Sequence, residues 1–122
     1  MSGIARWSYA NVATVWPHEG EDEWSGGVTY GAPYTIAVAW AGKAEQRRDS
    51  TGAEFTTNNM FWTEASSSGA AYVPVRVPAY RDRIAKGAHV GDWQDADAEE
   101  IRAVTDWEMS AFKDVPDYEI VT

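Results

Sequence analysis

The stretch Tyr34-Thr35-Ile36-Ala37-Val38-Ala39-Trp40 decides the fold class. Large side chains stand at every second position, and the smaller Thr35, Ala37 and Ala39 fill the positions between them. Side chains alternate between the two faces of a β-strand, so this period predicts a strand with one half-buried face. Pro33 precedes the strand, and Ala41-Gly42-Lys43 is predicted to turn the chain after it.

Segments on both sides of this strand show the same β character. We expect further strands at Arg6–Trp16, Val28–Tyr30, Glu54–Glu64, Glu100–Trp107 and Tyr118–Val121. Within Glu54–Glu64, Phe55 is at an odd position and Trp62 at an even one, so one regular strand would place them on opposite faces. This indicates a bulge at Asn58-Asn59 or two strands that meet there. For Ala96–Arg102 one helical turn is an alternative, although we favour the strand.

Polar and Gly-rich segments separate these strands. Pro17–Gly27 is predicted to be an acidic loop, Ala65–Ala71 a Ser/Gly-rich loop and Asp49–Gly52 a turn. Tyr72–Val77 alternates valines, but its prolines restrict it to an edge strand or an extended arm. The chain is therefore predicted to be one mainly β domain, residues 1–122. We expect a small β-barrel or β-sandwich of about six to eight short antiparallel strands with long polar loops and at most a short helix.

Composition narrows the function classes. The chain has no cysteine, which excludes disulfides, thiolate catalysis and cysteine-ligated zinc. Met1–Trp7 has no long apolar run, so we expect a soluble protein without signal peptide or membrane anchor. The net charge of −9 is uneven: Asp92–Thr122 carries ten acids against Arg102 and Lys113. This charge disfavours a protein that grips nucleic acid through its phosphates.

A search for catalytic and metal-binding patterns finds little. The two histidines are His18 and His89. His18 with Glu21 and Glu23 is a conceivable metal set, but the spacing does not match a calcium-binding loop. No phosphate-binding loop or nucleophile turn is present in the sequence. We therefore expect no enzymatic activity and no cofactor, and the many aromatic residues point instead to packing and to interfaces.

Two groups of segments resemble a known family. The first is Tyr30–Trp40 followed by Arg48-Asp49-Ser50-Thr51-Gly52-Ala53-Glu54-Phe55, and the second is Asp82-Arg83-Ile84-Ala85-Lys86-Gly87 followed by Ile101–Val104 and Asp114–Thr122. Together they resemble the small head-closure, or stopper, proteins of tailed bacteriophages. One departure is that Gly91-Asp92 comes later than the glycine-aspartate step of many family members, and an acidic insertion follows it.

The resemblance implies a structural protein of the virion neck, assembled in the host cytoplasm. Such a subunit forms a homo-oligomeric ring, with the portal or adaptor protein on the head side and a tail-completion or tail-tube protein on the tail side. The ring joins head to tail and retains the packaged DNA. Double-stranded DNA passes through its channel without sequence-specific binding, and no membrane is involved.

Two sets of residues are candidates for these contacts. Like charge keeps DNA from adhering, so the acidic loop is the candidate for the channel side, with His18, Glu19, Glu21, Asp22, Glu23 and Trp24. The candidates for contacts with a neighbouring subunit or ring are Trp62, Tyr72, Val73, Val75 and Trp93.

Three other functions remain open. A tail terminator or tail-completion protein would also be a small β or mixed domain. A carbohydrate-binding module would need exposed, coplanar aromatic residues, for which Trp24, Trp62 and Trp93 are candidates. A small enzyme would need a concave pocket with an acid or histidine tuned for catalysis.

Overall fold

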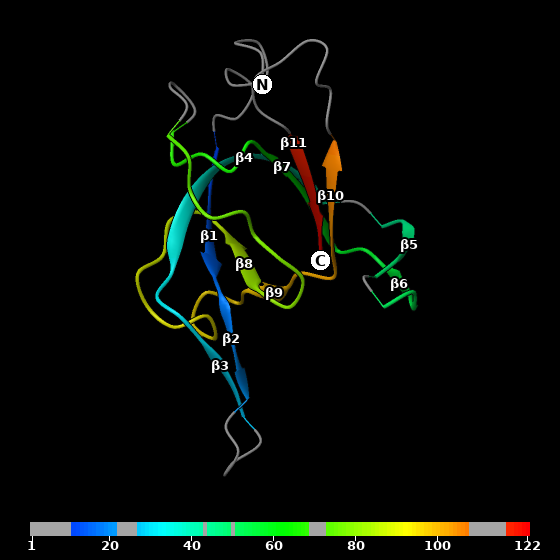
Figure 1. Ribbon diagram of the computed structural model, residues 1–122, viewed down its shortest axis with the longest axis horizontal. Helices are drawn as coiled ribbons and strands as arrows, with labels where there is room; N and C mark the ends of the chain where they lie inside the picture. The colour runs from blue at the N-terminus through cyan, green and yellow to red at the C-terminus, as the bar shows by residue number, and fades with distance from the viewer. Residues whose placement is uncertain (1–10, 22–26, 43, 50, 69–72, 108–116) are drawn as a thin grey trace.

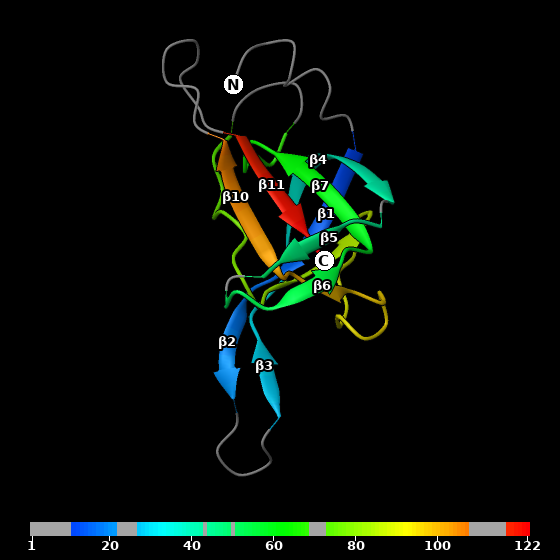
Figure 2. The same cartoon turned by 90° about the vertical axis from the view of Figure 1, so that its right-hand side faces the viewer.

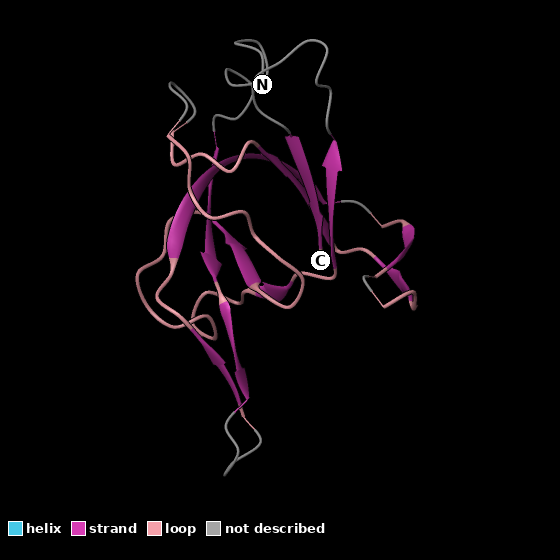
Figure 3. Cartoon of the chain, in the orientation of Figure 1, coloured by secondary structure: helices cyan, strands magenta, loops and turns pink. Residues whose placement is uncertain are grey.

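The computed structural model describes residues 11–21, 27–42, 44–49, 51–68, 73–107 and 117–122. Within these residues the chain forms eleven strands and no helix (Figures 1 and 3). The strands are β1 (Asn11–Trp16), β2 (His18–Glu21), β3 (Val28–Tyr30), β4 (Tyr34–Gly42), β5 (Gln46–Arg48), β6 (Glu54–Thr56), β7 (Asn59–Thr63), β8 (Arg83–Lys86), β9 (Glu99–Glu100), β10 (Ala103–Trp107) and β11 (Asp117–Val121).

Seven strands form one antiparallel sheet in the order β10-β11-β7-β4-β1-β8-β9. The sheet curls into a half-barrel, and β4 arches over it in Figure 1. Two separate ribbons, β2–β3 and β5–β6, complete the structure. The mainly β class predicted from the sequence is confirmed, with the barrel-like alternative preferred over the sandwich.

A short stretch of chain joins the two edges of the half-barrel. Only Ile101 and Arg102 separate β9 from β10, the two outermost strands of the sheet. The Ile101 N–H donates to the Asp82 carbonyl at 2.7 Å, and the Arg102 N–H donates to the Val121 carbonyl at 2.8 Å. Consecutive residues therefore bond to the β8 side and to the β11 side, which restricts how far the two edges can separate.

The concave face of the sheet holds the main core. The alternation seen in β4 directs Ile36 and Val38 inward, as predicted, and both are fully buried. Tyr34 and Trp40, on the same face, pack against the core at its margin. The core is completed by side chains from the other strands and the joining stretch: Ala13, Val15, Phe61, Ile84, Ile101 and Ile120.

A smaller cluster lies on the opposite face of β1 and β8. Trp16 is buried there against Ala85 and Ala98, with Tyr30 and Trp93 packed around it. The indole N–H of Trp16 donates to the carbonyl of Gly91 at 3.1 Å. This cluster fixes the 87–98 segment to the outside of the sheet.

Most of the predicted strands are confirmed, with shifted ends. Glu54–Glu64 divides into β6 and β7, as one of its two interpretations proposed. Glu100–Trp107 is β-structure rather than a helical turn, and residues 73–77 are an extended arm with a single bridge, from Ser66 to Pro74. Residues 6–10 of the Arg6–Trp16 prediction lie outside the described part.

Two turn and loop predictions are wrong. Pro17–Gly27 does not form a loop throughout, because His18–Glu21 pairs with Val28–Tyr30 as an antiparallel ribbon. The Ala41-Gly42 step continues β4 instead of turning, since both residues pair with β7. No helix in the described residues is long and apolar enough to span a bilayer.

Candidate assembly surface

The β2–β3 ribbon projects from one end of the half-barrel (Figures 1 and 2). Its register pairs His18 with Tyr30 and Glu21 with Val28, with an irregularity between His18 and Gly20. Gly20 has a φ of 139°, a conformation that L-residues rarely adopt, so glycine suits this irregular position. Val28 is 40% exposed, so the ribbon is not part of the packed core.

A buried carboxylate holds the base of the ribbon. Asp82 is 1% exposed, and its Oδ1 accepts a hydrogen bond from the His18 backbone N–H at 2.8 Å. Its Oδ2 accepts from the Ala79 N–H at 2.9 Å and from the Arg76 guanidinium at 2.6 Å. Asp82 thereby connects the first residue of the ribbon to the extended 73–80 segment.

The same network includes a tyrosine of the core margin. The Tyr34 hydroxyl donates to the Arg76 carbonyl at 2.9 Å and lies 3.2 Å from the Arg76 guanidinium. Burial raises the pKa of Tyr34, an effect that the contact with Arg76 partly offsets. The hydrogen bond to Asp82 is the main cause that raises the pKa of Arg76.

Aromatic and cationic side chains pack at the other side of the base. The Arg83 guanidinium carbon lies 4.0 Å from the centre of the Trp93 ring. Its Nε donates to the Tyr30 hydroxyl at 3.1 Å, and its Nη1 donates to the Ala98 carbonyl at 3.0 Å. The Tyr30 ring also meets His18 and Trp93 edge-on, with ring centres 5.9 Å and 5.5 Å apart.

A backbone hydrogen bond closes the ribbon next to these side chains. The Gly31 N–H donates to the Pro17 carbonyl at 2.7 Å. Gly31 also has the Glu19 carboxylate beside it, since a methyl group at this glycine would lie 3.1 Å from the Glu19 Oε2. Both strands of the ribbon are therefore tied to the half-barrel where they leave it, and the ribbon is a projection with a fixed base.

The ribbon segment is strongly acidic. Four acids occur between Glu19 and Glu23, and no lysine or arginine occurs in residues 7–42. Glu19 is exposed on β2. Of these acids, Glu19 has its carboxylate beside Gly31 at the base of the ribbon.

The structure brings part of the predicted channel-side set together. His18, Glu19 and Glu21 lie on β2, and the His18 ring packs on Tyr30. Asp22, Glu23 and Trp24 lie outside the described residues. In the described part of the chain, no three His, Asp or Glu side chains are arranged to hold a metal ion.

The predicted interface residues lie in separate parts of the fold. Trp62 is half-buried on β7, and its indole N–H donates to the Glu119 carboxylate at 3.3 Å. Val73 is 47% exposed in the extended arm, whereas Val75 packs partly against the core. Trp93 packs at the base of the ribbon, and Tyr72 lies outside the described residues.

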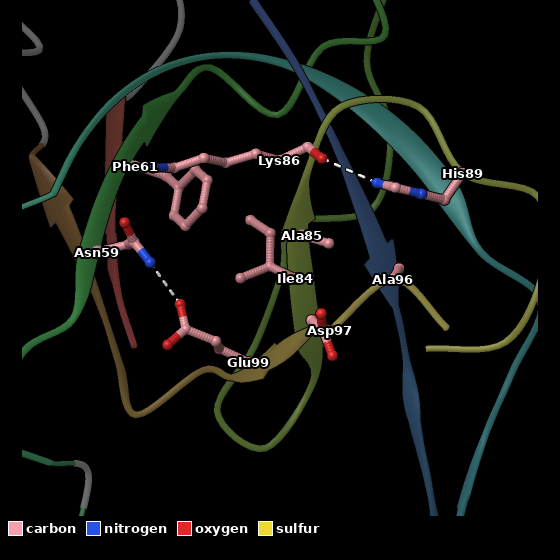
Figure 4. Close-up of a pocket in the computed structure, with 9 residues that line it drawn as sticks. All are labelled: Asn59, Phe61, Ile84, Ala85, Lys86, His89, Ala96, Asp97 and Glu99. Carbon is pink, nitrogen blue, oxygen red and sulfur yellow. Dashed lines mark hydrogen bonds between the residues drawn. The ribbon is translucent and has the colours of Figure 1, made fainter. Parts of the chain in front are cut away.

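A pocket of about 270 Å³ lies between β7, β8 and the 96–99 segment (Figure 4). Phe61 and Ile84 line it together with five polar side chains, those of Asn59, Lys86, His89, Asp97 and Glu99. The Glu99 carboxylate accepts from the Asn59 amide and from the Thr122 hydroxyl, and the His89 Nε2 lies 2.9 Å from the Lys86 carbonyl. Glu99 and His89 thus bond to the chain itself.

Sequence reasoning did not predict that Asp82 and Arg83 hold the base of a ribbon. Arg83 stacks on Trp93 and bonds to Tyr30. Asp82 begins a segment that carries the family resemblance, but the contact that holds the ribbon joins it to a residue 64 positions away. The composition of the segment from Asp82 to Gly87 gives no signal for this role.

The half-barrel with an acidic ribbon fixed at its base was compared with known proteins. Comparisons with protein-family models, with curated proteins and with solved structures found no match to this chain.

Proposed function

We propose that this chain is a structural subunit of the head–tail connector of a tailed phage, where a ring of copies under the portal or adaptor joins head to tail and helps to retain packaged DNA. The observation that carries the proposal is the β2–β3 ribbon, which projects from the half-barrel and is fixed at its base by Asp82 and Arg83. The segment resemblance to head-closure proteins supplies the biological context.

The ribbon suits a role inside a ring. In a closed ring each subunit offers two different surfaces to its neighbours, and an element that projects from the body is free to reach the axis. The hydrogen bonds at Asp82 and Gly31 give such an element a defined direction. Its acidic residues would repel the DNA phosphates, so the DNA could pass without adhering.

The carbohydrate-binding alternative receives less support from the described aromatic residues. Sugar rings stack on exposed, coplanar aromatic faces. Trp93 has the Arg83 guanidinium over its ring and stands at 62° to Tyr30. Trp62 is half-buried and bonds to Glu119. Tail-terminator and tail-completion roles remain the nearest alternatives, because each also needs a small subunit that assembles on a ring.

The test uses tailless, DNA-filled heads. Purified protein is added, binding is followed by sedimentation with the heads, and release of DNA is followed by its sensitivity to nuclease. We expect the full chain to bind and to protect the DNA. Absence of binding to competent heads would end the connector proposal on the head side, and the same preparation would then be tested on free tails.

A ribbon variant separates binding from DNA retention. Residues 19–29 are replaced by Asn-Gly, a pair that suits a two-residue hairpin turn between His18 and Tyr30. The ribbon lies outside the hydrophobic core, so we expect the variant to fold and to bind heads. We expect it to leave the DNA sensitive to nuclease. Heads that stay sealed would show that the ribbon does not act in the channel. The Arg48→Lys variant, with an exposed substitution in the β5–β6 ribbon, is the control.

A further inference from the structure

We propose that the groove between residues 30–33 and 90–94 binds an arginine side chain presented by a partner protein. The groove has a volume of about 420 Å³ and lies where the ribbon leaves the half-barrel. This inference is independent of the connector proposal, because it rests on the chemistry of the groove alone.

Aromatic and apolar side chains form part of the groove, and polar groups make up the larger share of its exposed lining. Trp16, Tyr30 and Trp93 line it, together with Pro33. Val90, at its rim, is 99% exposed, an unusual position for a large aliphatic side chain in the described part of the chain. These surfaces match the methylene groups of a long side chain and the flat face of a guanidinium group.

The groove carries negative charge and no lining cation. Asp92 is exposed and lines it directly. The Asp95 carboxylate lies beside Gly91, 4.0 Å from where a methyl group on that glycine would stand, and the Glu19 carboxylate lies beside Gly31 in the same way at 3.1 Å. Gly31 and Gly91 both line the groove. Three carboxylates around an aromatic wall attract a cation.

The chain itself provides a precedent for this recognition. The Arg83 guanidinium already rests 4.0 Å from the centre of the Trp93 ring and is bonded to the Tyr30 hydroxyl. The Tyr30 hydroxyl, the Ala98 carbonyl and the Trp93 ring are neutral, so the charge of Arg83 is also felt in the groove and has to be outweighed by the three carboxylates there. The groove repeats the same combination of Tyr30 and Trp93, with carboxylates in place of the carbonyl acceptor.

Arginine fits this combination better than other ligands. A phosphate or a nucleic acid would be repelled by Asp92, Asp95 and Glu19. A neutral apolar side chain would leave the carboxylates without a partner. A lysine ammonium is more strongly hydrated and lacks the planar face that stacks on an aromatic ring.

The experiment titrates the full-length ¹⁵N-labelled protein with a short peptide, acetyl-Gly-Arg-Gly-amide, and follows the amide and indole resonances. The matched probe replaces the arginine by citrulline, which keeps the shape and loses the charge. We expect saturable shifts at residues 30–33 and 90–94 and at the indole of Trp93. We expect the citrulline peptide to bind about three- to tenfold more weakly and the arginine affinity to fall as salt is raised.

Two variants keep the proposal falsifiable. Asp92→Asn removes a lining charge from an exposed position and should weaken arginine binding, whereas Asp106→Asn removes a charge that is also exposed, on β10, and should not. Equal shifts from the arginine and citrulline peptides, shifts that map elsewhere, or no difference between the two variants would overturn the proposal. Concentration-dependent shifts at the groove without any peptide would instead identify a second copy of the chain as its occupant, which also overturns it.

Discussion

The carboxylate of Asp82 accepts a hydrogen bond from the backbone N–H of His18 at 2.8 Å across 64 positions of sequence. His18 is the first residue of β2, and Asp82 directly precedes β8. The projecting ribbon is thus held by a buried acid that also binds Arg76, which is 45% exposed at its side chain. A single residue links ribbon, arm and sheet.

Replacing this acid should loosen the base of the ribbon before the rest of the fold. Asp82→Asn keeps one acceptor but removes the charge that Arg76 pairs with, and we expect a loss of about 2 kcal/mol in the free energy of unfolding. Hydrogen exchange at the His18 amide should be faster than in the parent protein. At the amides of β4 and β7, exchange should change only as much as the free energy of global unfolding does. Unchanged exchange at His18 would show that the ribbon is held by other contacts.

The stretch that joins the sheet edges should be the most sensitive part of the core. Ile101 is fully buried, and its backbone bonds to the Asp82 carbonyl while the next residue bonds to β11. Ile101→Ala removes apolar contacts where the two edges meet. We therefore expect the free energy of unfolding, measured by urea denaturation, to fall by about 2–5 kcal/mol. Arg102→Ala, at an exposed neighbouring position, is the matched comparison and should cost much less. Similar losses for both variants would contradict the role of the Ile101 side chain.

The raised pKa of Tyr34 predicts a loss of stability in alkali. Burial favours the neutral phenol, so the folded-state pKa lies above the ordinary value of 10.0. The folded protein then holds its proton more tightly than the unfolded chain. The contribution of Tyr34 to the free energy of unfolding is complete below the pKa of the unfolded chain and is lost as pH rises through the pKa of the folded protein. The free energy of unfolding, measured with urea from neutral pH to above about pH 10, should decline more steeply in the parent protein than in the Tyr34→Phe variant. Parallel curves for the two proteins would refute the assignment to Tyr34.

The sheet was predictable because its strands carry their own signal. In β4, alternating large and small residues are enough to identify the strand and its inward face, and Ile36 and Val38 are buried as expected. β3 and β11 carry enough β-branched and aromatic residues to be found within one residue of their ends. The Asn58-Asn59 irregularity was visible as a change of parity between Phe55 and Trp62.

The ribbon could not be predicted in this way. Residues 18–21 read His-Glu-Gly-Glu, which has no apolar alternation, and the segment becomes a strand only because it pairs with Val28–Tyr30 outside the core. Its base depends on Asp82 and Arg83, which the fold brings to it from distant sequence positions. Short polar strands of this kind are specified by tertiary contacts, which a local pattern does not contain.

The aromatic side of the base gives the last prediction. Arg83 combines three contacts, with the Tyr30 hydroxyl, the Ala98 carbonyl and the Trp93 ring, and its planar guanidinium is what allows them at once. Arg83→Lys keeps the charge but has a single ammonium group, so at least one contact is lost, and we expect about 1–2 kcal/mol less stability in urea. Near-ultraviolet circular dichroism should also change, since Trp93 and Tyr30 lose their common neighbour. Arg48→Lys is the control, because its side chain is 68% exposed and its ion pair with Glu54 should contribute little. If both variants were equally stable and had the parent spectrum, Arg83 would not contribute to holding the base of the ribbon.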